Sequence, residues 1–219
     1  DLTIERGGRL NIQTNPGTTH TLRNVTGGGD LQPNSGATVD INRSGVRFDG
    51  RLQTIPGSVT KTGTESWTLT NPDSHVHGGV TVAEGAWIMD GGSFDGKAPW
   101  TPVTVLPGAR FAVTSGTTTN TGTFTVGGAG NRSHLEINGN LRVNGHLNLE
   151  PRSRVLFNWN DGTSGPRARE LHVGGTLNHN GESIDSRGGD YLITVNSLQG
   201  KSNILVDGEK LTLTTRNDS

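Results

Sequence analysis

The chain contains no cysteine, one methionine, one tyrosine and only 5% aromatic residues among its 219 residues. The lack of cysteine excludes disulfide bonds and cysteine-ligated metal centres. It also fits export as an unfolded chain, in which an early disulfide would block passage. Hydrophobic residues make up 29%, which is little material for the core of a compact globule. An elongated stack of small layers needs fewer hydrophobic residues for its core.

Positive and negative residues are nearly equal in number, with 19 Lys and Arg against 20 Asp and Glu, and the net charge is -1. We therefore expect no nucleic-acid partner and no attraction to an anionic membrane. No apolar run approaches the roughly 18 residues that span a bilayer, so we expect no membrane insertion by this chain. Disordered chains usually carry a high net charge, which argues against disorder here.

Glycine is abundant, at 34 of 219 residues, about twice its average share. Short segments that alternate apolar and polar residues recur between Gly, Pro, Asn and Asp, for example at 38–41, 68–70 and 103–105. Alternation of this kind predicts short β-strands. No stretch shows a convincing helical period, so the sequence predicts an all-β fold with almost no helix.

Residues 135–149, LEINGNLRVNGHLNL, contain the clearest repeat. Two apolar residues at i and i+2 recur every six positions, so that both point to one face of a short strand. These inward-facing residues are Leu135, Ile137, Leu141, Val143, Leu147 and Leu149. Asn-Gly pairs between strands are a strong hairpin signal, but apolar pairs this short do not support independent hairpins.

A solenoid fits this repeat better, because each strand then turns a corner and pairs with the next coil. We predict a single-stranded parallel β-helix over residues 1–219, with coils of about 18–22 residues. The densest apolar alternation, and hence the densest coils, should lie at 135–215. The repeat alone permits either hand of winding.

Residues 58–90, SVTKTGTESWTLTNPDSHVHGGVTVAEGAWIMD, resemble the strand repeat of bacterial autotransporter passenger domains of the pertactin-like or AIDA-like type. Its T-K-x-G, T-L, Gly-Gly and T-V-x-x-G elements match Thr60, Lys61, Gly63, Leu69, Thr70, Gly78, Gly79, Thr81, Val82 and Gly85. Glu65 stands where the repeat has its second glycine. The resemblance implies a right-handed β-helix passenger fragment, exported by type V secretion and exposed at the bacterial outer membrane or secreted.

Two segments, 94–102 and 160–167, break the strand rhythm and should form loops that leave the stack, where function usually concentrates. We expect the binding residues there: Phe94, Asp95, Lys97, Trp100, Asn160, Asp161 and Arg167. The four tryptophans at positions 67, 87, 100 and 159 are expected in the core or at an end cap, with a sugar-stacking platform as the alternative.

Catalytic constellations are not evident. The carboxylates considered, Asp90, Asp95, Asp161, Asp185 and Asp190, form no sequence cluster, and turn chemistry explains most of them. His75 and His77 share one strand face, but no third metal ligand is identifiable nearby. We therefore expect no catalytic residue, no bound metal and no cofactor.

These observations and the resemblance imply a cell-surface or secreted passenger stalk that acts as an adhesin or host-protein-binding virulence factor. Its expected partner is a host-cell or serum protein, a glycan, or a second copy of itself. Two alternatives stay open. One is a carbohydrate-active β-helix enzyme, a polysaccharide lyase or hydrolase. The other is a passive export and spacer scaffold for a functional domain N-terminal to this chain.

Overall fold

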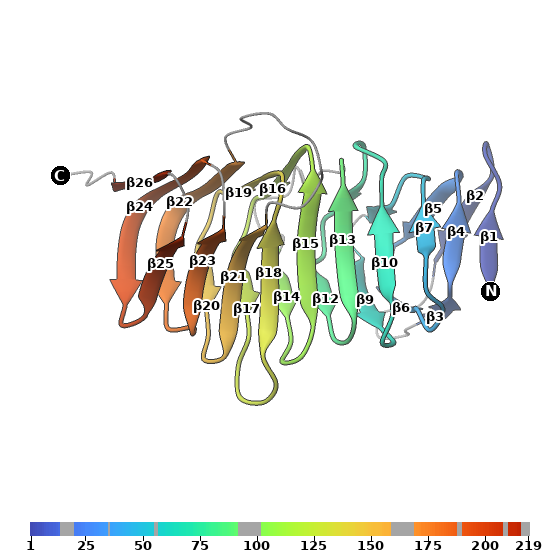
Figure 1. Cartoon of the computed structure of the whole chain (residues 1–219). Coiled ribbons are helices and arrows are strands. Elements are labelled where there is room, and N and C mark those ends of the chain that lie inside the picture. Colours follow the sequence, from blue (N-terminus) through green and yellow to red (C-terminus); the bar gives the residue numbers. More distant parts are fainter. Residues whose placement is uncertain are drawn as a thin grey trace.

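The computed structural model describes residues 1–13, 20–34, 36–54, 57–91, 102–158, 169–187, 190–207 and 210–215. In these ranges the chain forms β-strands and turns and no helix, so no described helix could cross a membrane. The strands stack side by side into an elongated solenoid, with β1 at one end and β25 and β26 at the other (Figure 1). Every pairing is parallel, which confirms the predicted parallel β-solenoid.

Each coil contributes one strand to a ten-stranded parallel sheet, called here the front sheet. Its strands in order are β1 (Leu2–Ile4), β4 (Val25–Gly27), β7 (Val46–Phe48), β10 (Ser66–Leu69), β13 (Ala86–Asp90), β15 (Arg110–Ser115), β18 (Ser133–Ile137), β21 (Ser153–Asn158), β23 (Ser183–Arg187) and β25 (Asn203–Asp207).

A second face follows the front sheet around the coil. In the N-terminal half it contains β2 (Arg9–Ile12), β5 (Asp30–Pro33), β8 (Gln53–Thr54) and β11 (His75–Val76). In the C-terminal half it contains β16 (Thr117–Asn120), β19 (Asn140–Val143), β26 (Lys210–Thr215) and the first parts of β22 (Arg169–His179) and β24 (Asp190–Gly200).

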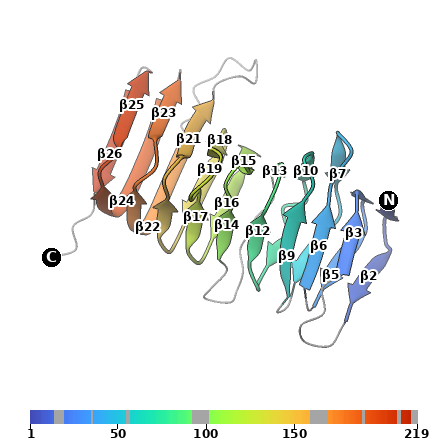
Figure 2. The ribbon, with the colours of Figure 1, turned by 90° about the horizontal axis from the view of Figure 1, so that it is seen from below.

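A third face closes each coil and is visible from below in Figure 2. It contains β3 (His20–Arg23), β6 (Gly36–Asp40), β9 (Ser58–Thr62), β12 (Val80–Val82), β14 (Val103–Val105), β17 (Phe124–Val126), β20 (Leu147–Leu149) and the second parts of β22 and β24.

The three strands of the 135–149 repeat do not pair with one another. Instead β18 pairs with β15 and β21, β19 with β16 and β22, and β20 with β17 and β22. The solenoid interpretation of the Asn-Gly turns is therefore confirmed over the hairpin one. A hairpin would have required direct pairing between strands that neighbour each other in sequence.

The length of a coil varies more than the sequence suggested. Register partners Trp67 and Trp87 are 20 residues apart (87 − 67), Phe111 and Leu135 are 24 apart, and Val155 and Ile184 are 29 apart. The predicted 18–22 residues was therefore too narrow. The register is continuous within most strand pairs, and shifts occur between Met89 and Asp90 of β13 and between Val173 and Thr176 of β22.

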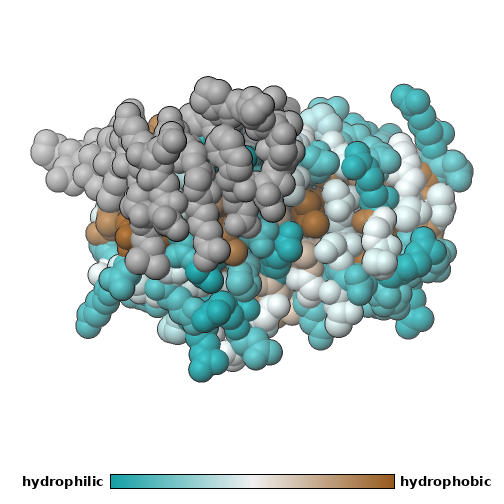
Figure 3. Space-filling view, in the orientation of Figure 1, coloured by the Kyte–Doolittle hydropathy of each residue, from teal (hydrophilic) through white to brown (hydrophobic). Residues whose placement is uncertain are grey.

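The predicted core is confirmed. The six apolar residues of the repeat, Leu135, Ile137, Leu141, Val143, Leu147 and Leu149, are all at most 1% exposed, whereas Arg142 between them is exposed. In Figure 3 polar residues make up most of the described surface over the front sheet. Leu106 and Leu198 are the exposed large apolar residues within the described ranges.

Trp67 and Trp87 lie in the core, as predicted, and are fully buried. Their rings meet edge to face with centroids 5.0 Å apart. The indole Nε1 of Trp67 donates a hydrogen bond of 3.1 Å to the carbonyl oxygen of Val25, 42 residues earlier in the chain. Neither ring can serve as a sugar platform. Trp100 and Trp159 lie outside the described residues.

We expect the coils after residue 135 to be more stable than those before residue 60. The N-terminal strands β1 to β12 contain two to five residues, whereas β22 and β24 contain 11 each. Because stability in a solenoid is a sum over coils and their interfaces, the longer strands should open less often. Hydrogen exchange of the backbone amides measures this. Equal protection along the chain, or stronger protection before residue 60, would contradict the gradient.

Candidate binding face

The residues predicted to bind a partner cannot be placed. Phe94, Asp95, Lys97 and Trp100 in the first expected loop, and Asn160, Asp161 and Arg167 in the second, all lie outside the described residues. Their role stays a prediction.

Of the five carboxylates considered from the sequence, the structure describes the side chains of Asp90 and Asp185, and these two have different partners. Asp95 and Asp161 are outside the described residues, and Asp190 begins β24. Asp185 is only 4% exposed and forms an ion pair with Arg154 of the neighbouring coil. Asp90 belongs to the corner network described below. Asp185 and Asp90 therefore have partners that assign them structural roles.

The outer surface of β2, β5, β8 and β11 is a continuous polar surface, called here the N-terminal polar face. Strand alternation explains it, since every second residue points to the core and the others point outward. The inward residues are Leu10, Ile12, Leu31, Pro33, Leu52, Thr54 and Val76. The outward residues form two rows along the stack. The charged row consists of Arg9, Asp30 and Arg51, and Asp73 lies in the turn that precedes β11. The second row, called here the amide row, consists of Asn11, Gln32 and Gln53 and ends at His75.

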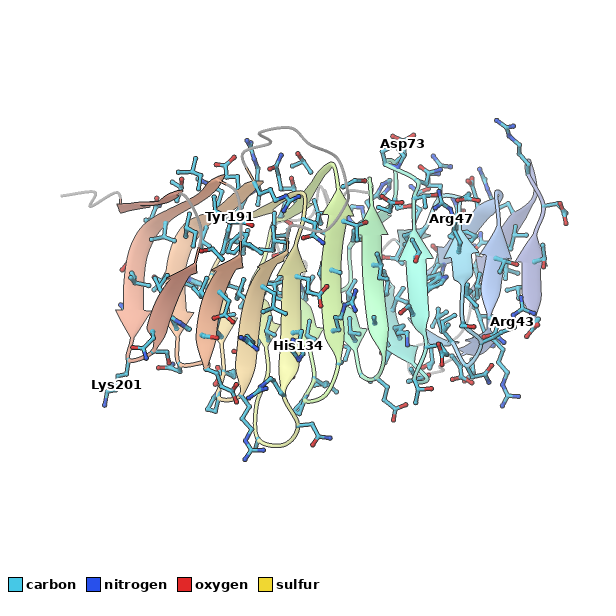
Figure 4. All side chains as sticks on the ribbon, in the orientation of Figure 1. Arg43, Arg47, Asp73, His134, Tyr191 and Lys201 are labelled. Atoms are coloured by element: carbon cyan, nitrogen blue, oxygen red, sulfur yellow. The ribbon has the colours of Figure 1, made fainter. Side chains whose placement is uncertain are left out.

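Opposite charges alternate along the charged row. Oδ2 of Asp30 lies 3.3 Å from the guanidinium of Arg9 and 2.7 Å from that of Arg51. The side chain of Asp30 is 24% exposed and that of Arg51 is 34% exposed, so each keeps a solvent-facing edge. The row itself contains two cations and one anion, and Asp73 in the turn before β11 adds a second anion at the edge of the face. In Figure 4, Asp73 lies near the upper edge of the stack.

The amides of the row are held in place by one hydrogen bond within the row and by one from Asn34, which follows β5. Nε2 of Gln32 donates to Oε1 of Gln53 over 2.9 Å, and Nδ2 of Asn34 donates to Oδ1 of Asn11 over 2.9 Å. A primary amide has two donor hydrogens and an oxygen with two lone pairs, so one such bond leaves further capacity on each side chain.

The two histidines expected to share a face lie at the end of the amide row. Their rings meet edge to face with centroids 5.5 Å apart. Nδ1 of His75 lies 2.8 Å from the carbonyl oxygen of Asp73. A carbonyl only accepts, so Nδ1 bears the hydrogen and Nε2 of the neutral ring is an acceptor. Within the described ranges no group of three or more potential metal ligands occurs.

A cleft of about 290 Å³ opens at the N-terminal end of the charged row. Gly7, Gly8, Gly28 and Gly29 line it together with Arg9 and Asp30. Glycine is required at this corner because successive coils approach closely. A Cβ atom on Gly29 would lie 2.4 Å from the carbonyl oxygen of Glu5, and one on Gly50 in the next coil would lie 1.8 Å from that of Gly29.

A second polar cluster, the corner network, lies where the front-sheet strands end. Arg47, labelled in Figure 4, contacts the carboxylates of Asp49 at 2.7 Å and Asp90 at 3.6 Å. Thr70 donates to Asp49 over 2.7 Å, and Ser115 donates to Asp90 over 2.6 Å. Sequence reasoning missed Arg47 and Asp49, because only the register between coils brings them near Asp90.

The corner network does not suit acid catalysis. The hydrogen bond from Thr70 and the contact with Arg47 lower the pKa of the Asp49 carboxyl. A glycosidase needs a carboxylic acid whose pKa is raised so that it can protonate the leaving group. Asp49 instead stays ionised and links two coils through Thr70.

Lys61 of the T-K-x-G element is fully buried. Its Nζ donates to the carbonyl oxygens of Gly63 at 2.5 Å and Glu84 at 2.9 Å, and so joins two successive coils. Burial lowers the pKa of Lys61 to about 8, although the negative charges of Glu84, Asp40 and Glu65 act in the opposite direction. The lysine of the repeat is therefore part of the core and not of a binding surface.

Fold and surface together define a parallel β-solenoid with an outward polar face and a glycine-lined cleft near its N-terminal end. Comparisons with models of protein families, with curated proteins and with solved structures each found no match. The structural class is therefore assigned from the structure itself, and the autotransporter resemblance of residues 58–90 is a basis for proposals only.

Proposed function

We propose that this chain is part of an autotransporter passenger, exposed on the bacterial surface or secreted, and that it acts as an adhesin-type stalk that binds a host component. The observation that carries the proposal is the stack itself. Rows of polar side chains recur coil by coil along a rigid, elongated scaffold, as on the N-terminal polar face. Each contact on such a surface is weak, and many copies on one cell would bind through avidity.

Three further observations support this proposal. The T-K-x-G lysine is buried and joins two coils, so the resembling segment forms a structural repeat of the stack. The chain has no cysteine that could form a disulfide before export. The longest strands lie toward the C-terminus, where a stable segment that emerges first could template the following coils.

The proposal is tested by incubating the purified chain, immobilised at high density on beads, with host serum, matrix proteins and host-cell membranes. Specific retention of a host component, lost when the beads carry the chain at low density, is the expected result. Beads that retain nothing above an unrelated β-solenoid at the same density would favour the passive scaffold instead.

We expect no enzymatic turnover by this chain. The motivation is the corner network, in which the two carboxylates are bonded to Arg47 and to hydroxyl groups. The measurement is the release of reducing or unsaturated ends from pectin and other polyuronates, with calcium present and absent. Turnover that disappears in the Asp49→Asn or the Asp95→Asn variant would contradict the binding proposal and favour a carbohydrate-active enzyme.

A further inference from the structure

We propose that the N-terminal polar face and its glycine-lined cleft bind a neutral oligosaccharide that runs along the solenoid axis. The inference rests on the proposed binding function and names the chemical class of one ligand and its site.

The hydrogen-bonding groups of the face match those of a sugar chain. Sugar hydroxyls both donate and accept, and each of the three amides of the row, Asn11, Gln32 and Gln53, offers both functions. Neighbouring coils lie about 4.8 Å apart, so Asn11, Gln32 and Gln53 present one amide per step along the axis. The bond between Gln32 and Gln53 and the bond from Asn34 to Asn11 orient these amides. This orientation reduces the entropy lost when a ligand binds.

The mixed charges of the face favour an uncharged glycan over a polyanionic one. Asp30 contacts both Arg9 and Arg51, and Asp73 in the neighbouring turn supplies the second negative charge, so the charges of the face balance. A polyanionic glycan would meet the carboxylate of Asp30 directly between the two arginines that attract it. A neutral sugar avoids this conflict and uses the remaining edges of the guanidinium and carboxylate groups.

The face offers little to a protein partner. Protein interfaces depend on a few aromatic or aliphatic anchors in well-packed pockets. The outward positions of the two rows carry only charged, amide and imidazole side chains, and the apolar residues between them point to the core. A saccharide, which binds through many hydrogen bonds, fits this surface better.

The cleft completes the site at the end of the rows. Its volume of about 290 Å³ is close to the lower limit of small-molecule pockets, about 300 Å³, and suits one sugar ring. Because glycines line the cleft, a sugar ring can approach the backbone closely. Arg9 and Asp30, which also line the cleft, can form charged hydrogen bonds with the ring.

Nuclear magnetic resonance of the ¹⁵N-labelled whole chain tests the proposal directly. The probes are cellohexaose, maltohexaose and N-acetylchitohexaose, with hexagalacturonate and a heparin hexasaccharide as charged counterparts. We expect at least one neutral probe to shift the side-chain amide signals of Asn11, Gln32 and Gln53 and the backbone signals of Gly28 and Gly29. Shifts confined to other faces, tighter binding of a charged probe, or no shift with any neutral probe would overturn it.

Matched variants separate binding from folding. Gln32→Ala and Gln53→Ala should each weaken binding about fivefold to tenfold, the effect of losing one or two hydrogen bonds. Gly28→Ala should weaken it as well, because a Cβ there has space, with its nearest neighbour, Cβ of Arg6, at 3.8 Å, yet narrows the cleft. Thr81→Ala on the third face is the control and should bind like the wild type. Equal affinity in all four variants would contradict the assigned site.

The two proposals fail in different ways. Retention of a host protein in the bead assay, together with no neutral-glycan shifts, would remove this inference and leave the adhesin proposal intact. Glycan shifts on the polar face without retention of any host component would support the site and contradict a host-directed role.

Discussion

Replacement of Leu141 by aspartate is expected to cost more than about 4 kcal/mol of stability, or to prevent folding altogether. Leu141 is fully buried, and its neighbours in register, Thr118 and Leu171, are fully buried as well. A carboxylate at this position would be placed between two coils without a counter-ion. Urea unfolding followed by circular dichroism measures the loss.

Arg142→Ala at the adjacent position is the control. The side chain of Arg142 is 55% exposed and lies 3.7 Å from the carboxylate of Glu170. A surface ion pair of this kind is worth about 0–1 kcal/mol. We expect a change within that range. A mild effect of Leu141→Asp together with a large effect of Arg142→Ala would mean that the strand presents the opposite face to the core.

The stability of the chain is expected to increase between about pH 8 and pH 10.5 because of Lys61. Burial lowers the pKa of this amine from 10.5 to about 8 in the folded chain. In that window the unfolded chain binds the proton and the folded chain does not, so raising the pH favours the folded state. The full effect of this pKa difference is about 3 kcal/mol. Below pH 8 the buried ammonium is destabilising relative to its deprotonated form.

The Lys61→Met variant isolates this contribution, because methionine has a similar shape and no charge. Other groups that titrate in the same range cancel when the unfolding free energy of the variant is subtracted from that of the wild type. The unfolding free energy of the wild type minus that of the variant should increase as the pH rises from 7 to 10. A difference that is constant with pH, or that shrinks, would contradict a buried lysine with a lowered pKa.

The sequence alone predicted the fold well where the structure depends on local alternation. The apolar pairs of residues 135–149 identified the core, and the shortness of those pairs distinguished a solenoid from hairpins. Both predictions depend on the spacing of apolar residues two positions apart within one strand. This spacing can be read from the local sequence. Trp67 and Trp87 were assigned correctly for the same reason, since they occupy inward positions of β10 and β13.

The polar face and the corner network could not be predicted, because they depend on register between coils. Arg9, Asp30 and Arg51 are about one coil apart in sequence, and the varying coil length hides their alignment. Asp49 and Asp90 are two coils apart and are linked through Arg47, which contacts both carboxylates. Lys61 did carry a signal, because it follows Val59 at the inward position of β9, but lysine is rarely buried.

The most direct test of the account is the adhesion of bacteria that display this chain. A non-adherent strain would carry the chain fused to an autotransporter membrane anchor, and a matched strain would carry the anchor alone at the same surface density. We expect the first strain to adhere to host cells clearly more than the second, and added soluble chain to compete weakly because single copies bind weakly. Equal adhesion of the two strains, with the chain confirmed at the surface, would contradict the proposed function and identify the stack as a passive spacer.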